Sequence, residues 1–172
     1  MKTPLPDSTK PPDPVQKAVR ISTPLGEMLL IANDQGLTHA LFADSTLPQL
    51  PTSLQESPED PILQEASRQI AQYFHSIRRQ FTLPLCPEGS DFDKKVWEIL
   101  ENILFGSLTT YGKVAHALGS PKAARAVGAA CGRNPIAILI PCHRVVGSAR
   151  NLVGYAGGVH RKNSLLNLEK AL

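Results

Sequence analysis

The sequence predicts an α+β protein of two units, and three observations support this fold class. Residues 15–42 alternate between apolar and polar positions, with turn-forming residues between the runs, which is typical of short strands. Residues 61–77 and much of the second half of the chain instead repeat apolar side chains at helical spacing. Pro87-Glu88-Gly89 indicates a hinge. We therefore expect a small N-terminal α+β domain over residues 15–88 and a mainly helical C-terminal domain over residues 89–172.

The N-terminal domain is expected to contain three strands followed by the helix at 61–77. The strands are predicted at VQKAVRIS (15–22), MLLIA (28–32) and LTHALF (37–42). Residues 44–61 are rich in Ser, Pro and Thr and are expected to be loop, while FTLPL (81–85) is a candidate for a further strand. Residues 1–14 hold five prolines and are interpreted as a flexible arm. No cluster of side chains in this domain indicates catalysis.

The C-terminal domain has the spacing of a helix-turn-helix. Helices are predicted at about 91–105, 111–118 and 120–131. Ser90 or Asp91 can cap the first helix, and Pro121 suits the first turn of the third. Two helices joined by a short turn containing Gly are typical of an element that reads DNA. An ordinary helical hairpin packed on a core has the same spacing, so both interpretations stay open here.

The charges are distributed unevenly along the chain. The net charge is +3, with seven Lys and Arg against nine acids in residues 1–84. Residues 102–172 carry nine Lys and Arg and one acid, Glu169. This bias suits a polyanionic partner such as nucleic acid, although a solvated basic face would look the same. The lone carboxylate of Glu169 is a candidate for a specific role.

Composition excludes several classes of protein. A hydrophobic content of 42% is ample for a core and argues against disorder. The sequence lacks an apolar run of the ~20 residues that a membrane span needs, and its first residues lack the apolar stretch of a secretory signal. Its three cysteines cannot all pair and form no C-x-x-C motif, so we interpret them as free thiols in a reducing cytoplasm.

Cys142 is the candidate nucleophile. The apolar run Ile136–Ile140 predicts a buried strand or extended segment that ends at Pro141 and presents Cys142, His143 and Arg144. Cationic neighbours lower a thiol pKa and make it reactive. Adjacent side chains diverge in an extended strand, so either the chain bends or a water joins Cys142 to His143. A buried core thiol is the alternative. With Glu169 these residues form a nucleophile, base and orienter set, which cysteine hydrolases also use.

Five blocks of the sequence carry a resemblance to a known family. Pro141-Cys142-His143-Arg144-Val145 resembles the active-site signature of the O6-alkylguanine-DNA alkyltransferases. The other similar blocks are DFDKKVWEIL (91–100), TYGKVAHALGSPKAARAVG (110–128), Asn134-Pro135-Ile136, and GYAGG (154–158) followed by Arg161-Lys162. The likeness is dense over 91–172 and weak in the N-terminal domain, where ISTPLGEMLLIA carries it.

The resemblance implies a fold and a partner. The N-terminal domain would have a ribonuclease-H-like fold, and the helix-turn-helix would dock in the minor groove of double-stranded DNA that carries O6-alkylguanine. Arg125 would enter the base stack and fill the gap left by the extruded guanine, since chemistry on O6 within a duplex requires base flipping. The other implied DNA contacts are Tyr111, Lys122, Ala126, Ala130 and Arg133.

The resemblance also implies the chemical roles. Cys142 would accept the alkyl group, His143 would draw its proton through a water, and Glu169 would orient His143. Asn134 would brace the turn before Cys142, and Tyr111 would donate to guanine N3. The base pocket would comprise the main chain at Cys142 and Val145 and a loop at Tyr155 and Ala156. Ala156 departs from members with Ser at this position, so only its backbone N–H would bond O6.

The resemblance further implies an irreversible, single-turnover reaction without a cofactor. A thioether at Cys142 is a very poor leaving group, so the protein would not be regenerated. A structural zinc site is not expected, because no Cys precedes Cys86. The protein is expected to act as a monomer, with cooperative assembly on DNA and activity on O4-alkylthymine left open. A rival class is a DNA-binding module that marks lesions without chemistry, against which the presence of Cys142 argues.

Overall fold

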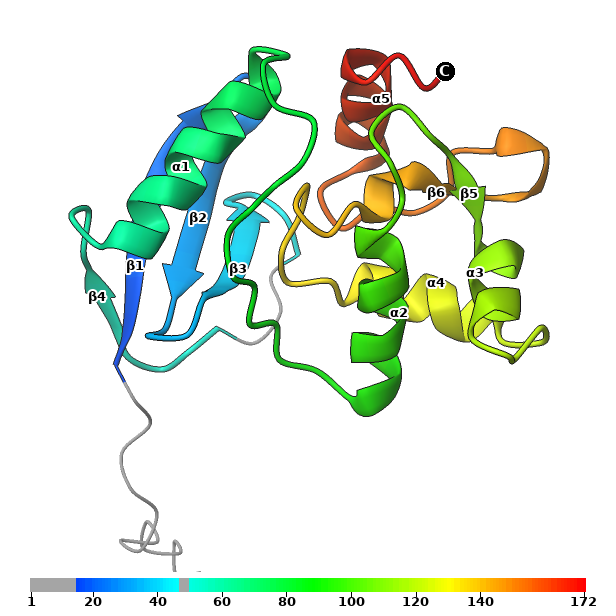
Figure 1. Cartoon of the computed structure of the whole chain (residues 1–172), viewed down its shortest axis with the longest axis horizontal. Coiled ribbons are helices and arrows are strands. Elements are labelled where there is room, and N and C mark those ends of the chain that lie inside the picture. Colours follow the sequence, from blue (N-terminus) through cyan, green and yellow to red (C-terminus); the bar gives the residue numbers. More distant parts are fainter. Residues whose placement is uncertain (1–14, 47–49) are drawn as a thin grey trace, which may run out of the picture.

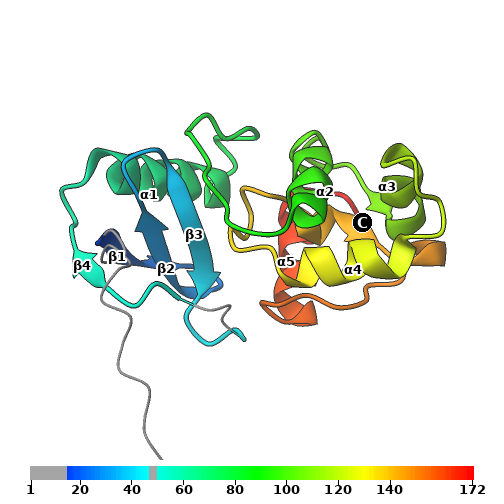
Figure 2. The same ribbon diagram turned by 90° about the horizontal axis from the view of Figure 1, so that it is seen from below.

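The protein forms two units that lie side by side (Figures 1 and 2). The computed structural model describes residues 15–46 and 50–172. The predicted arm at 1–14 lies outside these residues. One unit combines a sheet with helix α1, and the other contains helices α2 to α5 (Figure 1). None of the helices in the described ranges has both the length and the apolar character needed to cross a bilayer.

The sheet has four strands in the order β3-β2-β1-β4. They are β1 (Gln16–Thr23), β2 (Gly26–Ala32), β3 (Leu37–Phe42) and β4 (Leu54–Glu56). The first three are the predicted strands and are antiparallel neighbours, and β4 pairs in parallel with β1. The sequence predicts a loop at β4, which is wrong for these residues. Its three residues are all exposed, so they carry no apolar alternation that could have revealed a strand.

Helix α1 (Pro61–Phe74) packs against the sheet (Figure 1). The side chain of Asp60 accepts hydrogen bonds from the backbone N–H groups of Ile62 and Leu63, at 3.0 and 3.1 Å. Pro61 occupies the first turn, where its lack of a backbone N–H costs no hydrogen bond within the helix. The helix ends three residues before the predicted limit, because Ser76 takes a left-handed conformation with φ of 58°.

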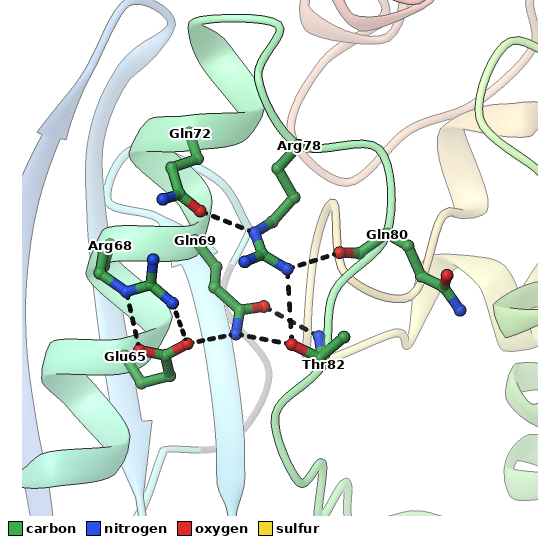
Figure 3. A network of polar contacts seen from close by, with 7 residues as sticks. All are labelled: Glu65, Arg68, Gln69, Gln72, Arg78, Gln80 and Thr82. Atoms are coloured by element: carbon green, nitrogen blue, oxygen red, sulfur yellow. Dashed lines mark hydrogen bonds and ion pairs between the residues drawn. The ribbon is translucent and has the colours of Figure 1, made fainter.

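A polar network ties the chain after α1 back onto that helix (Figure 3). The buried Gln69 accepts from the backbone N–H of Thr82 at 2.9 Å and donates to its Oγ1 at 3.2 Å. Arg78 donates to Gln72 Oε1 at 2.9 Å. Side chains therefore bond the carbonyl of Gln80 and the N–H of Thr82, while the backbone of Pro84 and Cys86 pairs with Leu37. The predicted strand at 81–85 is accordingly wrong, and only Leu85 forms a bridge, with Leu37 of β3.

The second unit contains most of the helices. Its elements are α2 (Asp91–Glu101), β5 (Thr109–Thr110), α3 (Tyr111–Ala117), α4 (Ala124–Gly132), the 3-10 helix Cys142–Arg144, β6 (Val145–Val146), the 3-10 helix Ser148–Arg150 and α5 (Val159–Leu168). Helices α3 and α4 pack together as the predicted helix-turn-helix pair. Helix α4 begins later than predicted, because Ser120 to Ala123 form a separate turn closed by a 2.9 Å backbone bond.

The strand or extended segment predicted at Ile136–Ile140 is also wrong, since only Ile136 forms a bridge and the chain then turns. Ile138 has a φ of 73°, and the N–H of Ile140 donates to the carbonyl of Ile136 at 3.0 Å. Asn134 closes this turn. Its Oδ1 accepts from Ile136 N at 2.9 Å and its Nδ2 donates to Ile140 O at 2.8 Å. One side chain thus holds both ends of the segment that leads to Cys142.

The free edge of β3 is covered by the second unit. Ala40 N donates to Pro135 O at 2.9 Å, and Ala137 N donates to Ala40 O at 2.8 Å. Arg161 of α5 adds a second link, with its guanidinium 4.3 Å from the centre of the Phe42 ring and its Nε 2.8 Å from Leu25 O. Covering a sheet edge removes a site of unwanted strand pairing. A single buried apolar cluster runs through both units as a result.

We predict that Asp60→Ala lowers the free energy of unfolding by about 1 kcal/mol, the usual cost of losing a helix N-cap. Urea unfolding followed by circular dichroism would measure it. Glu59→Ala is the matched control, because Glu59 is exposed and precedes the cap. Equal stability of the two variants would contradict the capping role.

Candidate functional site

Cys142 lies where the chain bends into a 3-10 helix, with only 7% of its surface exposed. The chain bends here, but His143 Nδ1 has no hydrogen-bond partner among the described residues, so the bend alone does not join His143 to Cys142. Asn134 Nδ2 donates to Cys142 Sγ at 3.2 Å. Burial raises the pKa of the Cys142 thiol, while the Asn134 hydrogen bond and the charge of Lys162 lower it. The Cys142 thiol therefore depends on these neighbours to ionise to a thiolate.

His143 and Glu169 form a fully buried pair, with 2.7 Å between His143 Nε2 and Glu169 Oε1. Burial opposes ionisation of the carboxyl, but hydrogen bonds from His143 and Arg144 outweigh it, and the pKa of Glu169 is lowered. A carboxylate can only accept, so Nε2 must carry the ring proton. Burial lowers the pKa of His143 and favours neutral imidazole. Nδ1, which has no hydrogen-bond partner among the described residues, is therefore left as a proton acceptor.

The sequence predicts that the charge of Arg144 lowers the pKa of the Cys142 thiol, but the guanidinium of Arg144 binds Glu169 instead. Its Nε lies 2.9 Å from Glu169 Oε2, and its Nη2 lies 3.0 Å from Oε1. Its Nη1 donates to the carbonyl of Ile103. The guanidinium thus neutralises the buried carboxylate of Glu169. The bend at Cys142 directs the side chains of Cys142 and Arg144 to different partners.

Lys162 is the functional candidate that the sequence analysis missed. It is fully buried, and its Nζ donates to the carbonyls of Val153 and Gly154 at 3.1 and 3.3 Å and to Tyr111 Oη at 3.5 Å. These partners are neutral, so its charge is not cancelled and acts on Cys142. Burial lowers the pKa of Lys162, and Cys142 raises it. The sequence offered only a weak signal, a lysine within a motif beside Arg161.

A path leads from the surface to the sulfur. An open groove of about 640 Å³ runs between the starts of α3 and α4 and the loop at 148–154, with Arg125 on its wall. An inner cavity of about 90 Å³ ends on Cys142. Tyr111, Gly128 and Gly154 line both spaces, so the groove leads into the cavity. Tyr111 donates to Val153 O at 3.0 Å, and burial raises its pKa to about 12, so it stays a hydrogen-bond donor.

A larger hollow lies elsewhere and does not suit this chemistry. It encloses about 780 Å³ between the loop at 79–85 and the end of α2. No cysteine, serine, lysine or histidine lines it among the described residues. We therefore place the site at the smaller cavity, whose lining includes Cys131 and Cys142. The candidate base His143 follows Cys142 along the chain, and the charge of Lys162 acts on the Cys142 thiol.

The remaining predicted residues fall into three groups. Lys122, Arg125 and Ala126 are exposed at α4 and the turn before it. Arg133 is also exposed, but it binds Asp93 through two hydrogen bonds of 3.0 and 2.7 Å. The expected DNA contact of Ala130 is corrected, because Ala130 is fully buried in the core and its carbonyl accepts from Trp97 Nε1 at 3.0 Å.

The pocket loops complete the site. Val145 is buried in β6, which pairs with β5 beside Tyr111. Tyr155 borders the inner cavity, and its hydroxyl is buried without a partner in the described ranges. Ala156 is exposed next to it. Residues 15–46 and 50–172 hold no group of three His, Cys, Asp or Glu side chains suited to a metal ion.

Comparison with known families decides the assignment. Residues 91–171 match the family model described as "6-O-methylguanine DNA methyltransferase, DNA binding domain", and residues 20–87 match "6-O-methylguanine DNA methyltransferase, ribonuclease-like domain". The chain belongs to the 6-O-methylguanine DNA methyltransferase family. The predicted α+β fold class, with a ribonuclease-like N-terminal part, is thereby confirmed.

Relatives within the 6-O-methylguanine DNA methyltransferase family are similar over nearly their whole length. The methylated-DNA–protein-cysteine methyltransferase of Methanosarcina acetivorans is 44% identical over 148 residues, 86% of this chain and 94% of that protein. The constitutive enzyme of that name from Bacillus subtilis is 41% identical over 151 residues, 86% of this chain and 92% of that protein. The crystal structure of Mycobacterium tuberculosis OGT in complex with DNA superposes with a TM-score of 0.84 at 38% identity, covering 90% and 93% of the two chains.

We predict that Lys162→Met raises the pKa of Cys142, because the side chain keeps its bulk but loses the charge that favours thiolate. Alkylation of Cys142 by iodoacetamide, followed by peptide mass spectrometry, should become severalfold slower at neutral pH and require higher pH. Lys113→Met on the exposed face of α3 is the matched control. An unchanged pH profile in Lys162→Met would show that Lys162 does not act on the sulfur.

Proposed function

We propose that this protein repairs O6-alkylguanine in double-stranded DNA by transferring the alkyl group to Cys142, once per molecule. One observation carries the proposal. The groove beside Arg125 shares Tyr111, Gly128 and Gly154 with an inner cavity that Cys142 lines, and His143, next to Cys142 in the chain, forms a fully buried pair with Glu169. Membership of a family whose relatives are named methylated-DNA–protein-cysteine methyltransferases supports the same reaction.

Binding begins at α4, the second helix of the helix-turn-helix. We infer that α4 lies in the minor groove and that Lys122 and Ala126 contact the backbone. Arg125 is exposed among small residues on this helix, which suits insertion into the base stack in place of the flipped guanine. The basic bias of residues 102–172 supplies phosphate contacts, so affinity should fall as salt rises.

Chemistry follows when the flipped base enters the inner cavity. The Cys142 proton passes through a water to His143 Nδ1, and the resulting thiolate attacks the alkyl carbon. The carbon–oxygen bond breaks, and its electrons remain on guanine. Tyr111 exchanges its hydrogen bond to Val153 O for one to guanine N3 and so offsets the developing charge, with Lys162 close to its hydroxyl.

The pocket wall recognises the base through its main chain. We infer that the carbonyls at Cys142 and Val145 accept from the guanine amine and that Ala156 N–H donates to O6. The guanine anion takes up one proton, and His143 releases the one that it accepted from Cys142, so the products are neutral guanine and a thioether on Cys142. A thioether does not leave, so no second turnover follows and no cofactor is consumed. O4-alkylthymine presents the same kind of carbon–oxygen bond and is the second substrate to test.

We predict that one alkyl group is added to the Cys142 peptide when the protein meets duplex carrying a single O6-methylguanine. Peptide mass spectrometry would locate it, and Cys142→Ala should bind the duplex without gaining mass. Cys86→Ser is the matched control and should react normally, because Cys86 lies outside the cavity lining. Transfer by Cys142→Ala, or continued transfer beyond one equivalent, would overturn the proposal. Binding without any mass gain in the wild-type protein would instead support the lesion-marking class.

We predict that Arg125→Ala slows repair in duplex at least tenfold while leaving the reaction with free O6-benzylguanine nearly unchanged, since only the duplex requires base flipping. Transfer rates with the two substrates would measure the difference. Arg20→Ala removes an exposed arginine from β1 and controls for the loss of charge. Equal losses with both substrates would rule out the finger role.

A further inference from the structure

The carboxylate of Glu169 is held by groups from both domains. The hydroxyl of Tyr73, on α1 of the N-terminal domain, donates to Glu169 Oε1 at 2.7 Å. That same oxygen lies 2.7 Å from His143 Nε2. Oε2 accepts from the backbone N–H of Gly106 at 3.2 Å and from Arg144 Nε at 2.9 Å. Tyr73 is thus the member of this set that comes from outside the C-terminal domain.

The Tyr73 hydroxyl has a defined position. Its ring is fully buried and packs on Phe74, Phe81 and Phe105, with ring centres 5.5, 5.7 and 6.0 Å away. Burial and the nearby Glu169 charge raise the pKa of Tyr73, so the hydroxyl keeps its proton and remains a donor. A buried tyrosine hydroxyl requires a hydrogen-bond partner, and Glu169 of the C-terminal domain is the partner of Tyr73.

We propose that Tyr73 is a positioning residue for alkyl transfer, because its hydroxyl orients the Glu169 oxygen that holds His143. The inference rests on the proposed function and extends it to the N-terminal domain. Three donors share Oε1, namely Tyr73 Oη, His143 Nε2 and Arg144 Nη2, so the carboxylate cannot rotate without losing at least one of them. A hydrogen-bond partner fixes the orientation and tautomer of the group that it contacts, as carboxylates do for the histidines that bind metal ions. The N-terminal domain, which has no catalytic cluster of its own, would complete the site in this way.

The Tyr73 hydrogen bond also sets how strongly Glu169 attracts a proton on His143. The charged groups that face His143 are Glu169, which raises its pKa, and Arg144 and Lys162, which lower it. A hydrogen bond from Tyr73 draws negative charge away from Oε1. Without it, Glu169 stabilises imidazolium more strongly and the pKa of His143 rises. His143 would then already hold a proton at pH values where the wild-type residue can still accept one.

The test is Tyr73→Phe in the full chain, which removes the hydroxyl and keeps the ring. With free O6-benzylguanine, the limiting transfer rate should fall about tenfold while the apparent affinity stays unchanged, a loss typical of removing an orienting partner. The acidic limb of the pH–rate profile should move to higher pH. Nitrogen NMR of the His143 ring should show the same upward shift in its titration, without any need for transfer. A fluorinated tyrosine at position 73 is a stronger donor and should shift both midpoints downward.

Phe81→Leu is the matched control, because it disturbs the same aromatic packing but leaves the hydroxyl in place. It should lower stability without moving either midpoint. In a Glu169→Gln background, Tyr73→Phe should cause no further shift. If Tyr73→Phe behaves like Phe81→Leu in all readouts, the inference is wrong. A wild-type protein that gains no mass at Cys142 would refute the proposed function alone, and the His143 titration would still decide the role of Tyr73.

Discussion

The site depends on one buried charge, the carboxylate of Glu169. An ion inside a protein is stable only when its lone pairs are satisfied and its charge is balanced. Here Arg144 balances the charge, and His143, Gly106 and Tyr73 supply further donors. This requirement determines the tautomer of His143, directs Arg144 away from the thiol and joins α1 to the C-terminal domain. The proton acceptor at Nδ1 is a consequence of how Glu169 is satisfied.

Asn134 makes the second structural connection. Its side chain bonds both ends of the turn at Ile136 and Ile140 and donates to Cys142 Sγ. The group that shapes the approach to the nucleophile is therefore also a partner of the sulfur. Few substitutions at position 134 would keep these bonds, because the short amide of asparagine both donates and accepts hydrogen bonds. The turn, its left-handed Ile138 and the orientation of the thiol are linked through one amide.

Cys142 and Lys162 show how burial can serve reactivity. Burial favours the neutral forms of both, raising the thiol pKa and lowering the lysine pKa. Each charged form stabilises the other where both residues are buried, because charges interact more strongly there than in water. The arrangement suits the single use of the nucleophile that we propose, because the buried thiol is shielded until a base enters. The proposed path through the α4 groove provides that entry.

The sequence by itself determined what depends on near neighbours along the chain. Apolar periodicity predicted α1, α2 and the α3–α4 pair, and the Pro141 to Val145 block indicated Cys142 as the candidate nucleophile beside the candidate base His143. The tertiary structure decided what depends on distant residues. Tyr73 and Glu169 are 96 positions apart, and nothing in the pattern of α1 indicates which buried side chain meets a carboxylate. The same holds for Lys162, for the buried Ala130, and for the turn at Ile136–Ile140, which Asn134 imposes on an apolar run. Periodicity reports which face of an element is buried, whereas the partner of each buried polar group is set only when the two domains pack together.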